Sequence, residues 1–255
     1  MAMFHVEVSP ISRGRGMSIA QRLSYVSGTS LVDCFTGKTY SKERDDVRFC
    51  QIYQPSPAPE KFYELQALAD ALDRAETRKD SRTGRELVCS LPNELHIEDW
   101  VEIVEQFIDE DVLCHRLCAV AAIHSGRNAE NPQKNNPHAH LIISTRAVSA
   151  DGFSGWKDRQ RDKLEYLVRC REQWAHLQNL AFERNGLEIR LDHRSYREQG
   201  IDREPRKHLS RTGWEMEKRG ERTLVGDANR AIHERNDERS RQQEIDRLRE
   251  LEHER

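Results

Sequence analysis

The chain has 255 residues and a formal net charge of −3, with 33% charged and 36% hydrophobic residues. This length accommodates one large domain, or one domain with an extension, and the low hydrophobic content indicates that part of the chain is a solvated extension. The charge excludes a uniformly basic nucleic-acid-binding domain, although residues 11–31 contain arginines and no acidic residue. The sequence contains no secretory or membrane-length apolar run, which predicts a protein without membrane insertion. The six cysteines form no Cys-x-x-Cys pair, and a reducing cytosol is the predicted compartment.

The N-terminal half alternates between predicted strands and helices. Apolar side chains alternate over residues 3–8, which predicts a half-buried strand. Residues 18–27 form an apolar stripe at helical spacing and are followed by Gly28, a typical helix stop. Further along, the patterns predict a strand at 47–53, a helix at about 60–78 and a strand at 86–91.

The second half supplies the rest of the predicted sheet. Residues 94–111 are typical of an amphipathic helix with an acidic exposed face. Two strands follow, around His124 and His138, and because both are apolar on both faces they should be central in the sheet. A long helix at about 159–184 and a short strand at 187–191 complete an α+β fold, with a central antiparallel sheet and helices packed on one face.

The apolar pattern fades from Arg219 onward, where few apolar residues stand among Glu, Arg and Gln. Such a segment is typical of a solvated, polar helical extension or a linker. Because the sequence stops inside this charged run, we expect the natural protein to continue beyond Arg255.

The most informative run is 136–143, with the sequence NPHAHLII. On a strand, His138 and His140 point to the same face, and antiparallel pairing with the run ending at His124 brings a third imidazole beside them. Three neutral imidazoles with an open fourth position are typical of a catalytic metal site. The alternative is that these histidines are ordinary strand residues; a cupin site is disfavoured because residues 141–144 contain no glutamate.

Tyr25 is a candidate nucleophile. It lies on the predicted helix at 18–27 but off its apolar stripe, and Arg22 shares its face one turn earlier. A tyrosine hydroxyl attacks phosphorus readily when a metal or an arginine neutralises the phosphate oxygens. The alternative is a partly buried structural tyrosine.

Several runs together resemble the MobA/MobL-type conjugative relaxases. These runs are FHV and ISR near the N-terminus, LSYVSG around Tyr25, RE with LPNEL from Arg85, NPHAHL from Asn136, and DHRSY, QGIDREP and HL between Asp192 and Leu209. They occur in the family's order and cover roughly residues 1–210.

The resemblance implies a fold of the HUH single-strand endonuclease superfamily with one catalytic tyrosine. The expected domains are a DNA-nicking and strand-transfer domain at 1–210 and a charged helical extension or linker at 211–255. Tyr25 would attack a plasmid nick site to form a 5′-phosphotyrosine and later allow religation. Metal ligands would be His124, His138 and His140, holding a divalent ion, Mn²⁺ or Mg²⁺. Implied partners are single-stranded DNA at a transfer origin, accessory relaxosome proteins and a type IV secretion coupling protein. The protein would be cytoplasmic in a bacterium and would enter a recipient cell bound to DNA.

The family match also suggests roles around this centre. Glu86 occupies the family's acidic position, where it would orient a metal histidine or accept the tyrosine proton, and His5 is a possible supporting residue on the same face. The remaining candidates for DNA contact are Arg13, Arg15, Arg22, Arg194, Tyr196 and Arg203. Trp156, Trp174 and Trp214 are available for base stacking, although Trp174 fits a helix core better.

Three alternatives remain open at this point. A rolling-circle replication initiator would use the same chemistry. A three-histidine metallohydrolase would act on a small molecule, with Tyr25 incidental. A non-catalytic DNA-binding module would repress its own promoter.

Overall fold

A computed structural model describes residues 4–126 and 135–253. The chain forms two compact units, Met1–His193 and Arg194–Arg255. None of the described helices combines the length and apolar character needed to cross a bilayer. The functional division at 1–210 and 211–255 stays a prediction.

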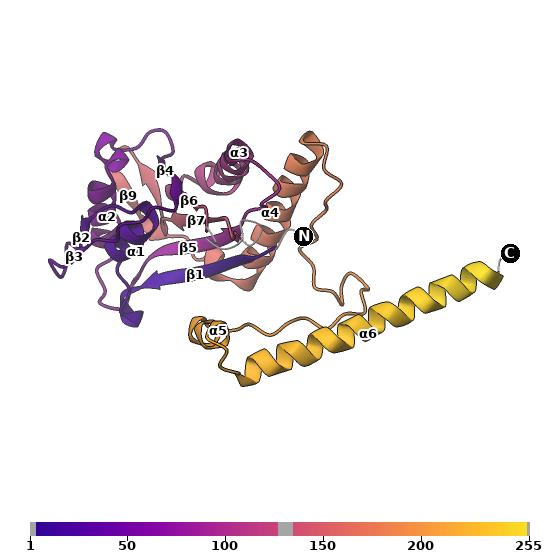
Figure 1. The fold of residues 1–255 in the computed structure, drawn as a ribbon. Coiled ribbons are helices and arrows are strands. Elements are labelled where there is room, and N and C mark those ends of the chain that lie inside the picture. The colour runs from indigo at the N-terminus through magenta and orange to yellow at the C-terminus, as the bar shows by residue number, and fades with distance from the viewer. Residues whose placement is uncertain (1–3, 127–134, 254–255) are drawn as a thin grey trace. The chain divides into compact units, whose positions relative to one another are not determined.

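The first unit is built on a five-stranded sheet in which every neighbouring pair is antiparallel. In spatial order the strands are β1 (Val6–Ser12), β5 (Arg82–Ser90), β7 (His138–Ile143), β6 (Ala119–His124) and β4 (Val47–Tyr53). The α+β prediction is confirmed, as is the inner position of the two strands that carry the histidines. Both are apolar on both faces because both faces are covered (Figure 1).

One face of the sheet carries the larger hydrophobic core. It packs against α3 (Ile97–Phe107) and α4 (Leu164–Arg184). Strand residues such as Leu141 and helix residues such as Phe107 and Trp174 are fully buried there. Trp174 is therefore a core residue, as its helix stripe predicts.

The opposite face carries a second core and the histidines. It packs against α1 (Ile19–Ser27) and α2 (Leu65–Arg74), with buried Val120 and Ile142 beneath them. The prediction that helices pack on one face only is wrong. Alternate residues of the inner strands are apolar on this side as well, so this face also needs a cover.

Two hairpins were not predicted from the sequence. They pair β2 (Leu31–Val32) with β3 (Thr39–Tyr40), and β8 (Arg146–Ser149) with β9 (Gly152–Lys157). The second hairpin presents Trp156, which is 88% exposed.

Some predicted boundaries are corrected by the structure. The helix predicted at 60–78 divides into a 3-10 turn, η2 (Glu60–Tyr63), and α2. The acidic helix ends earlier, because α3 passes into a π turn, η3 (Ile108–Val112). Short 3-10 turns also stand at η1 (Arg13–Arg15), η4 (Leu113–His115) and η6 (Gln160–Asp162).

The predicted strand at 187–191 is wrong. Leu187, Ile189 and Leu191 do pack against the larger core, which explains their alternation. However, the Asn179 side chain of α4 accepts a hydrogen bond from the Leu191 backbone N–H at 2.8 Å and donates one to its carbonyl at 2.9 Å. The asparagine takes the place of a neighbouring strand.

The second unit contains α5 (Arg211–Lys218) and α6 (Leu224–His253) after an irregular segment. Most of α6 is exposed, as the polar pattern predicts, while Ile232 and Asn236 are buried. The Asn236 side chain bonds the Glu204 backbone at both its N–H and its carbonyl, at 2.9 Å each. This contact ties the irregular segment to α6.

Candidate active site

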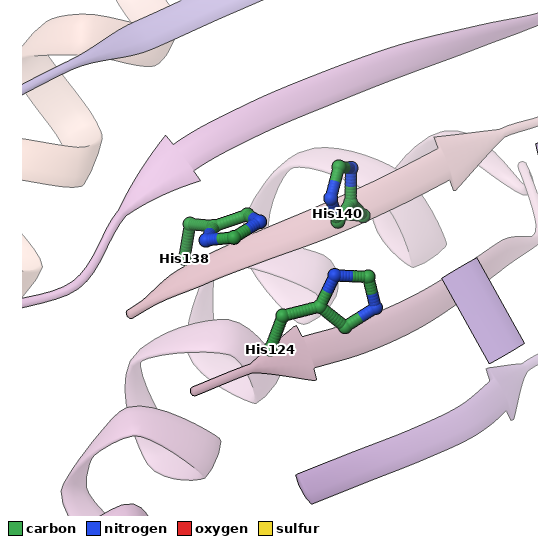
Figure 2. Close-up of side chains that lie close together, drawn as sticks. All are labelled: His124, His138 and His140. Atoms are coloured by element: carbon green, nitrogen blue, oxygen red, sulfur yellow. The ribbon is translucent and has the colours of Figure 1, made fainter. Parts of the chain in front are cut away.

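Three histidines meet on two neighbouring strands. His138 and His140 occupy alternate positions of β7, and His124 at the end of β6 pairs with His138 across the ladder. Figure 2 shows the three rings on the same side of the two strands. One ring nitrogen from each lies within 4.8 Å of the others. The structure thus brings together the three residues predicted as metal ligands.

Hydrogen bonds determine which nitrogen of each ring carries the proton. His124 Nε2 lies 2.8 Å from the Val26 carbonyl oxygen, and His138 Nδ1 lies 2.7 Å from that of Asn136. His140 Nδ1 lies 2.9 Å from Glu86 Oε1. Since each partner is an acceptor, each of these nitrogens donates, and the other nitrogen of each ring keeps its lone pair.

The remaining nitrogens fit a metal ion. His124 Nδ1 and His140 Nε2 are buried and have no hydrogen-bond partner among the described residues. Burial lowers the pKa of His124 to about 4, and burial also lowers the pKa of His138. Neutral imidazoles with unshared lone pairs are the form that binds a transition metal. Unpaired buried nitrogens would otherwise be costly.

Glu86 connects the histidines to an arginine. Its side chain is buried on β5, where it accepts bonds from His140 and from Arg22 Nε at 2.9 Å and Nη2 at 2.5 Å. Burial alone would raise the pKa of Glu86, but the bonds from His140 and Arg22 hold it below its ordinary value. A carboxylate held in this way is suited to orienting His140 and is a poor proton acceptor.

Tyr25 stands beside the same cluster. Helix α1 begins after Ser18, which accepts a bond from the Gln21 N–H, and ends at Gly28, whose φ of 74° is left-handed. The half-buried Tyr25 ring lies edge-on to His124 and His140, with centroids 6.2 and 5.9 Å apart. The tyrosine predicted as nucleophile is therefore a neighbour of the predicted metal ligands.

Two arginines stack on the Tyr25 ring. The guanidinium carbon of Arg22 lies 4.8 Å from the ring centroid, and that of Arg44 lies 4.4 Å from it. Arg44 also forms a two-point ion pair with Asp46, at 2.7 and 2.6 Å. The hydrogen bonds from Arg44 lower the pKa of Asp46 to about 2.

Sequence reasoning missed Arg44 and Asp46. They lie in the irregular segment between β3 and β4, where neither helical nor strand periodicity marks a functional face. The only available sign was an arginine close to an acidic residue, which is common on protein surfaces.

The other predicted residues are more dispersed. Arg13 directs all five of its N–H donors into the protein, to the backbone and carboxylate of Asp73 and to the carbonyls of Glu76 and Arg78. This arrangement favours a structural role over the predicted DNA contact. Arg15 is exposed in η1.

His5 lies next to the start of β1, where its backbone bonds the Ser90 side chain and its imidazole faces Glu7 at 3.7 Å. β5 separates it from the histidine strands. The structure does not bring it into the three-histidine cluster. Arg194, Tyr196 and Arg203 are exposed residues of the second unit, and their DNA contacts stay predictions.

A glycine closes the loop that joins the two histidine strands. Gly126 has a φ of +52°, and a Cβ built there would lie 2.0 Å from the Asn136 carbonyl oxygen. That oxygen is the one that accepts the bond from His138 Nδ1. Only glycine allows this approach without displacing the support of His138.

The chain is similar to curated mobilization proteins. It is 28% identical to "Probable mobilization protein MobA" of Bifidobacterium longum over 93% of this chain and 48% of that protein. It is 31% identical to "Mobilization protein A" of Escherichia coli over 88% of this chain and 31% of that protein. The chain thus spans about half or less of the length of these two relatives.

Solved structures share the fold. One, described as "Molecular Basis of Vancomycin Resistance Transfer in Staphylococcus aureus", superposes with a TM-score of 0.67 at 24% identity, covering 76% of this chain and all of that chain. Another, TrwC complexed with a 27-mer DNA "comprising the recognition hairpin and the cleavage site", gives 0.50 at 10% identity, covering 91% of this chain and 98% of that chain. The sequence model of the MobA/MobL family matches residues 17–219, most of the chain. The chain belongs to the MobA/MobL family.

Proposed function

We propose that this chain is the DNA-nicking part of a plasmid mobilisation relaxase. It would cleave one strand at a transfer origin by transesterification and later religate it. The observation that carries the proposal is the position of Tyr25, edge-on to two of three histidines that each place a ring nitrogen within 4.8 Å of the others. A nucleophile beside a phosphate-polarising centre is the arrangement that this reaction requires.

The chemistry follows from the residues around Tyr25. The tyrosine oxygen loses its proton and bonds to the scissile phosphorus, the bond from phosphorus to the 3′ oxygen breaks, and that oxygen leaves with a proton. The 5′-phosphotyrosine retains a phosphodiester, so a 3′-hydroxyl can reverse the step. Arg22 and Arg44 place positive charge beside the reacting group. Glu86 fixes the His140 tautomer and supports binding rather than proton transfer.

The metal would be held by His124 Nδ1, His138 Nε2 and His140 Nε2, the nitrogens left free by their hydrogen bonds. When bound, a divalent ion would act as a Lewis acid on a non-bridging phosphate oxygen. Of the two expected ions, Mn²⁺ suits three nitrogen donors better than Mg²⁺, which prefers oxygen ligands and keeps its waters. Calorimetric titration of the metal-free protein should give tighter binding of Mn²⁺ than of Mg²⁺. Equal or reversed affinities would contradict this assignment.

The substrate would be single-stranded DNA at the transfer origin, in keeping with the cleavage-site DNA that the TrwC structure holds. Accessory relaxosome proteins and a type IV secretion coupling protein would complete the machinery. The reaction would begin in the bacterial cytoplasm and end with transfer of the chain and its DNA to a recipient.

A covalent-adduct assay tests the proposal. The protein is incubated with single-stranded DNA from the transfer origin of the replicon that encodes it, with Mn²⁺, and resolved under denaturing conditions. We expect a protein–DNA adduct that is absent in Tyr25→Phe and in the presence of a chelator. Tyr53→Phe is the matched control, because Tyr53 bonds Glu105 on the other side of the sheet. An adduct that survives Tyr25→Phe would refute the nucleophile, and no adduct on either origin strand would refute the function.

A further inference from the structure

The two arginines on the Tyr25 ring differ in what holds them. Arg22 is bonded to buried Glu86, which in turn holds His140, so its position belongs to the histidine network. Arg44 is bonded to Asp46, which lies outside the strands and helices. The side chain of Arg44 is nevertheless only 12% exposed. A charged side chain this enclosed, in an irregular segment, calls for a physical reason.

The segment that carries Arg44 is fastened at both ends. Ser24 of α1, next to Tyr25, donates a hydrogen bond to the Tyr40 carbonyl at 3.0 Å. At the other end, the Ser125 N–H, which follows His124, donates to the Asp46 carbonyl at 2.8 Å. Both anchors therefore come from residues adjacent to the proposed nucleophile or to a proposed ligand.

The segment also passes near the end of α1. A Cβ added at Gly28 would lie 3.8 Å from the backbone nitrogen and the Cβ of Arg44. The start of the Arg44 side chain thus lies near the helix cap, three residues after Tyr25, with room for about a methyl group between them. The segment is therefore tied to α1 through Tyr40, and the guanidinium of Arg44 lies over the Tyr25 ring of the same helix.

The ion pair with Asp46 selects one orientation of the guanidinium. The two bonds use Nε and one Nη2 hydrogen, and a guanidinium carries five N–H donors. Three donors remain beyond the ion pair, while the guanidinium carbon lies over the Tyr25 ring, 4.4 Å from its centroid. The hydrogen bonds with Asp46 raise the pKa of Arg44 against the effect of burial, and Tyr25 contributes to this rise.

We propose that Arg44, held by Asp46, is a positioning residue that fixes the Tyr25 ring for attack on the scissile phosphate. The inference rests on the proposed function for its catalytic consequence. Its structural part, the hold on Tyr25, is independent of that function. Arg44 does not form or break a bond; it restricts the directions that the phenol oxygen can take.

The first test observes the ring itself. Protein labelled with 3-fluorotyrosine is compared by 19F NMR, and the Tyr25 resonance is assigned by its loss in Tyr25→Phe. Arg44→Gln should shift and broaden this resonance, and Asp46→Asn should shift it in the same direction by less. Arg48→Gln, which removes the same charge from an exposed position on β4, should leave it in place. An unchanged Tyr25 resonance in Arg44→Gln would overturn the inference.

The second test separates rate from binding. Misplacement of a reacting group by about 1 Å costs on the order of 100-fold in rate. Arg44→Gln should therefore slow single-turnover adduct formation at saturating DNA by about 100-fold. DNA affinity, measured in the Tyr25→Phe background, should change by less than about threefold, because one positioning contact is lost and not a phosphate-binding site. Arg44→Lys should recover little, because an ammonium cannot reproduce the planar stack and the two-point bond.

Asp46→Asn should slow the reaction in the wild-type background and have no further effect in Arg44→Gln, because it acts through Arg44. Additive losses would overturn the role of the pair. A rate that falls only as far as affinity falls would show a simple DNA contact and would also overturn it. If wild type makes an adduct through Tyr25 and Arg44→Gln reacts normally, only this inference fails. If wild type makes no adduct, the proposed function fails with it.

Discussion

The two faces of the central sheet are built by the same strands but have different roles, because one packs in a hydrophobic core and the other carries the candidate active site. On β7, Ala139, Leu141 and Ile143 are fully buried in the core that packs against α3 and α4. The intervening positions, His138 and His140, lie on the other face, where His140 contacts the Tyr25 ring of α1. Successive residues of the strand point to opposite faces, so one set packs in the core and the other lines the candidate active site.

Both faces keep buried polar atoms without a partner among the described residues, the Gln178 Oε1 atom of α4 on one and two ring nitrogens on the other. The α3/α4 face buries Trp174 with its N–H bonded to the Ser90 carbonyl at 2.9 Å. The opposite face buries two imidazole nitrogens that have no partner among the described residues. Buried nitrogens of this kind cost stability unless a ligand satisfies them. Substitutions on the α3/α4 face should therefore lower the stability of the fold, whereas substitutions of the histidines should lower metal binding.

The largest effect is expected at a proposed ligand. His138→Ala should reduce adduct formation by roughly 1,000-fold, because the ion contributes several kcal/mol of charge stabilisation. His138 is only half-buried, so folding should be retained. Metal affinity by calorimetry and the adduct rate check this, with exposed His176→Ala on α4 as the control. Normal cleavage by His138→Ala would refute the metal role.

The neighbouring position on the other face should behave in the opposite way. Leu141→Ala removes a fully buried side chain and should lower the free energy of unfolding by about 2 to 5 kcal/mol. Urea denaturation in the presence of a chelator measures this loss. The folded fraction should bind Mn²⁺ as wild type does. A large loss of metal affinity without a loss of stability would contradict the division between the faces.

An intermediate effect is expected at Glu86. A glutamine still accepts the His140 N–H but loses the charge that holds Arg22, so Glu86→Gln should weaken metal binding by about 10- to 100-fold. Glu7→Gln on β1, an exposed glutamate on the same face, is the control. If Glu86 were instead the proton acceptor, the adduct rate would fall at saturating metal while metal affinity stayed the same.

The smallest effect is expected at the loop closure. An alanine at Gly126 must move the Asn136 carbonyl away from His138, and its left-handed backbone costs about 1 to 2 kcal/mol. Gly126→Ala should therefore weaken Mn²⁺ binding by about 10-fold, in the range found for groups that support a ligand. Gly155→Ala, which meets nothing within 4 Å, is the control in the same calorimetric titration. Equal affinities of the two variants would show that the carbonyl does not orient His138.

Local periodicity was sufficient for the elements that carry the site. The run around His138 and His140 predicted both the strand and the shared face, and helix α1 followed from its stripe and its glycine stop. The inner position of β6 and β7 followed from apolar residues on both faces. These features depend on residues that are near one another in sequence.

Features that depend on distant partners were beyond sequence reasoning. The bond between Arg22 and Glu86 joins residues 64 positions apart, and the full engagement of Arg13 depends on the end of α2. Arg44 belongs to no periodic element, so its contact with Tyr25 had no pattern to reveal it. The wrong strand at 187–191 has a similar origin, because Asn179 supplies the bonds of a strand neighbour.

The central claim is that Tyr25 carries the DNA, and peptide mapping of the adduct tests it most directly. Trypsin should release residues 23–38, which contain Tyr25 and none of the other five tyrosines. After nuclease trimming, mass spectrometry should find the 5′-phosphonucleotide on this peptide. A nucleotide on any other peptide, such as the one that contains Tyr196, would contradict the assignment.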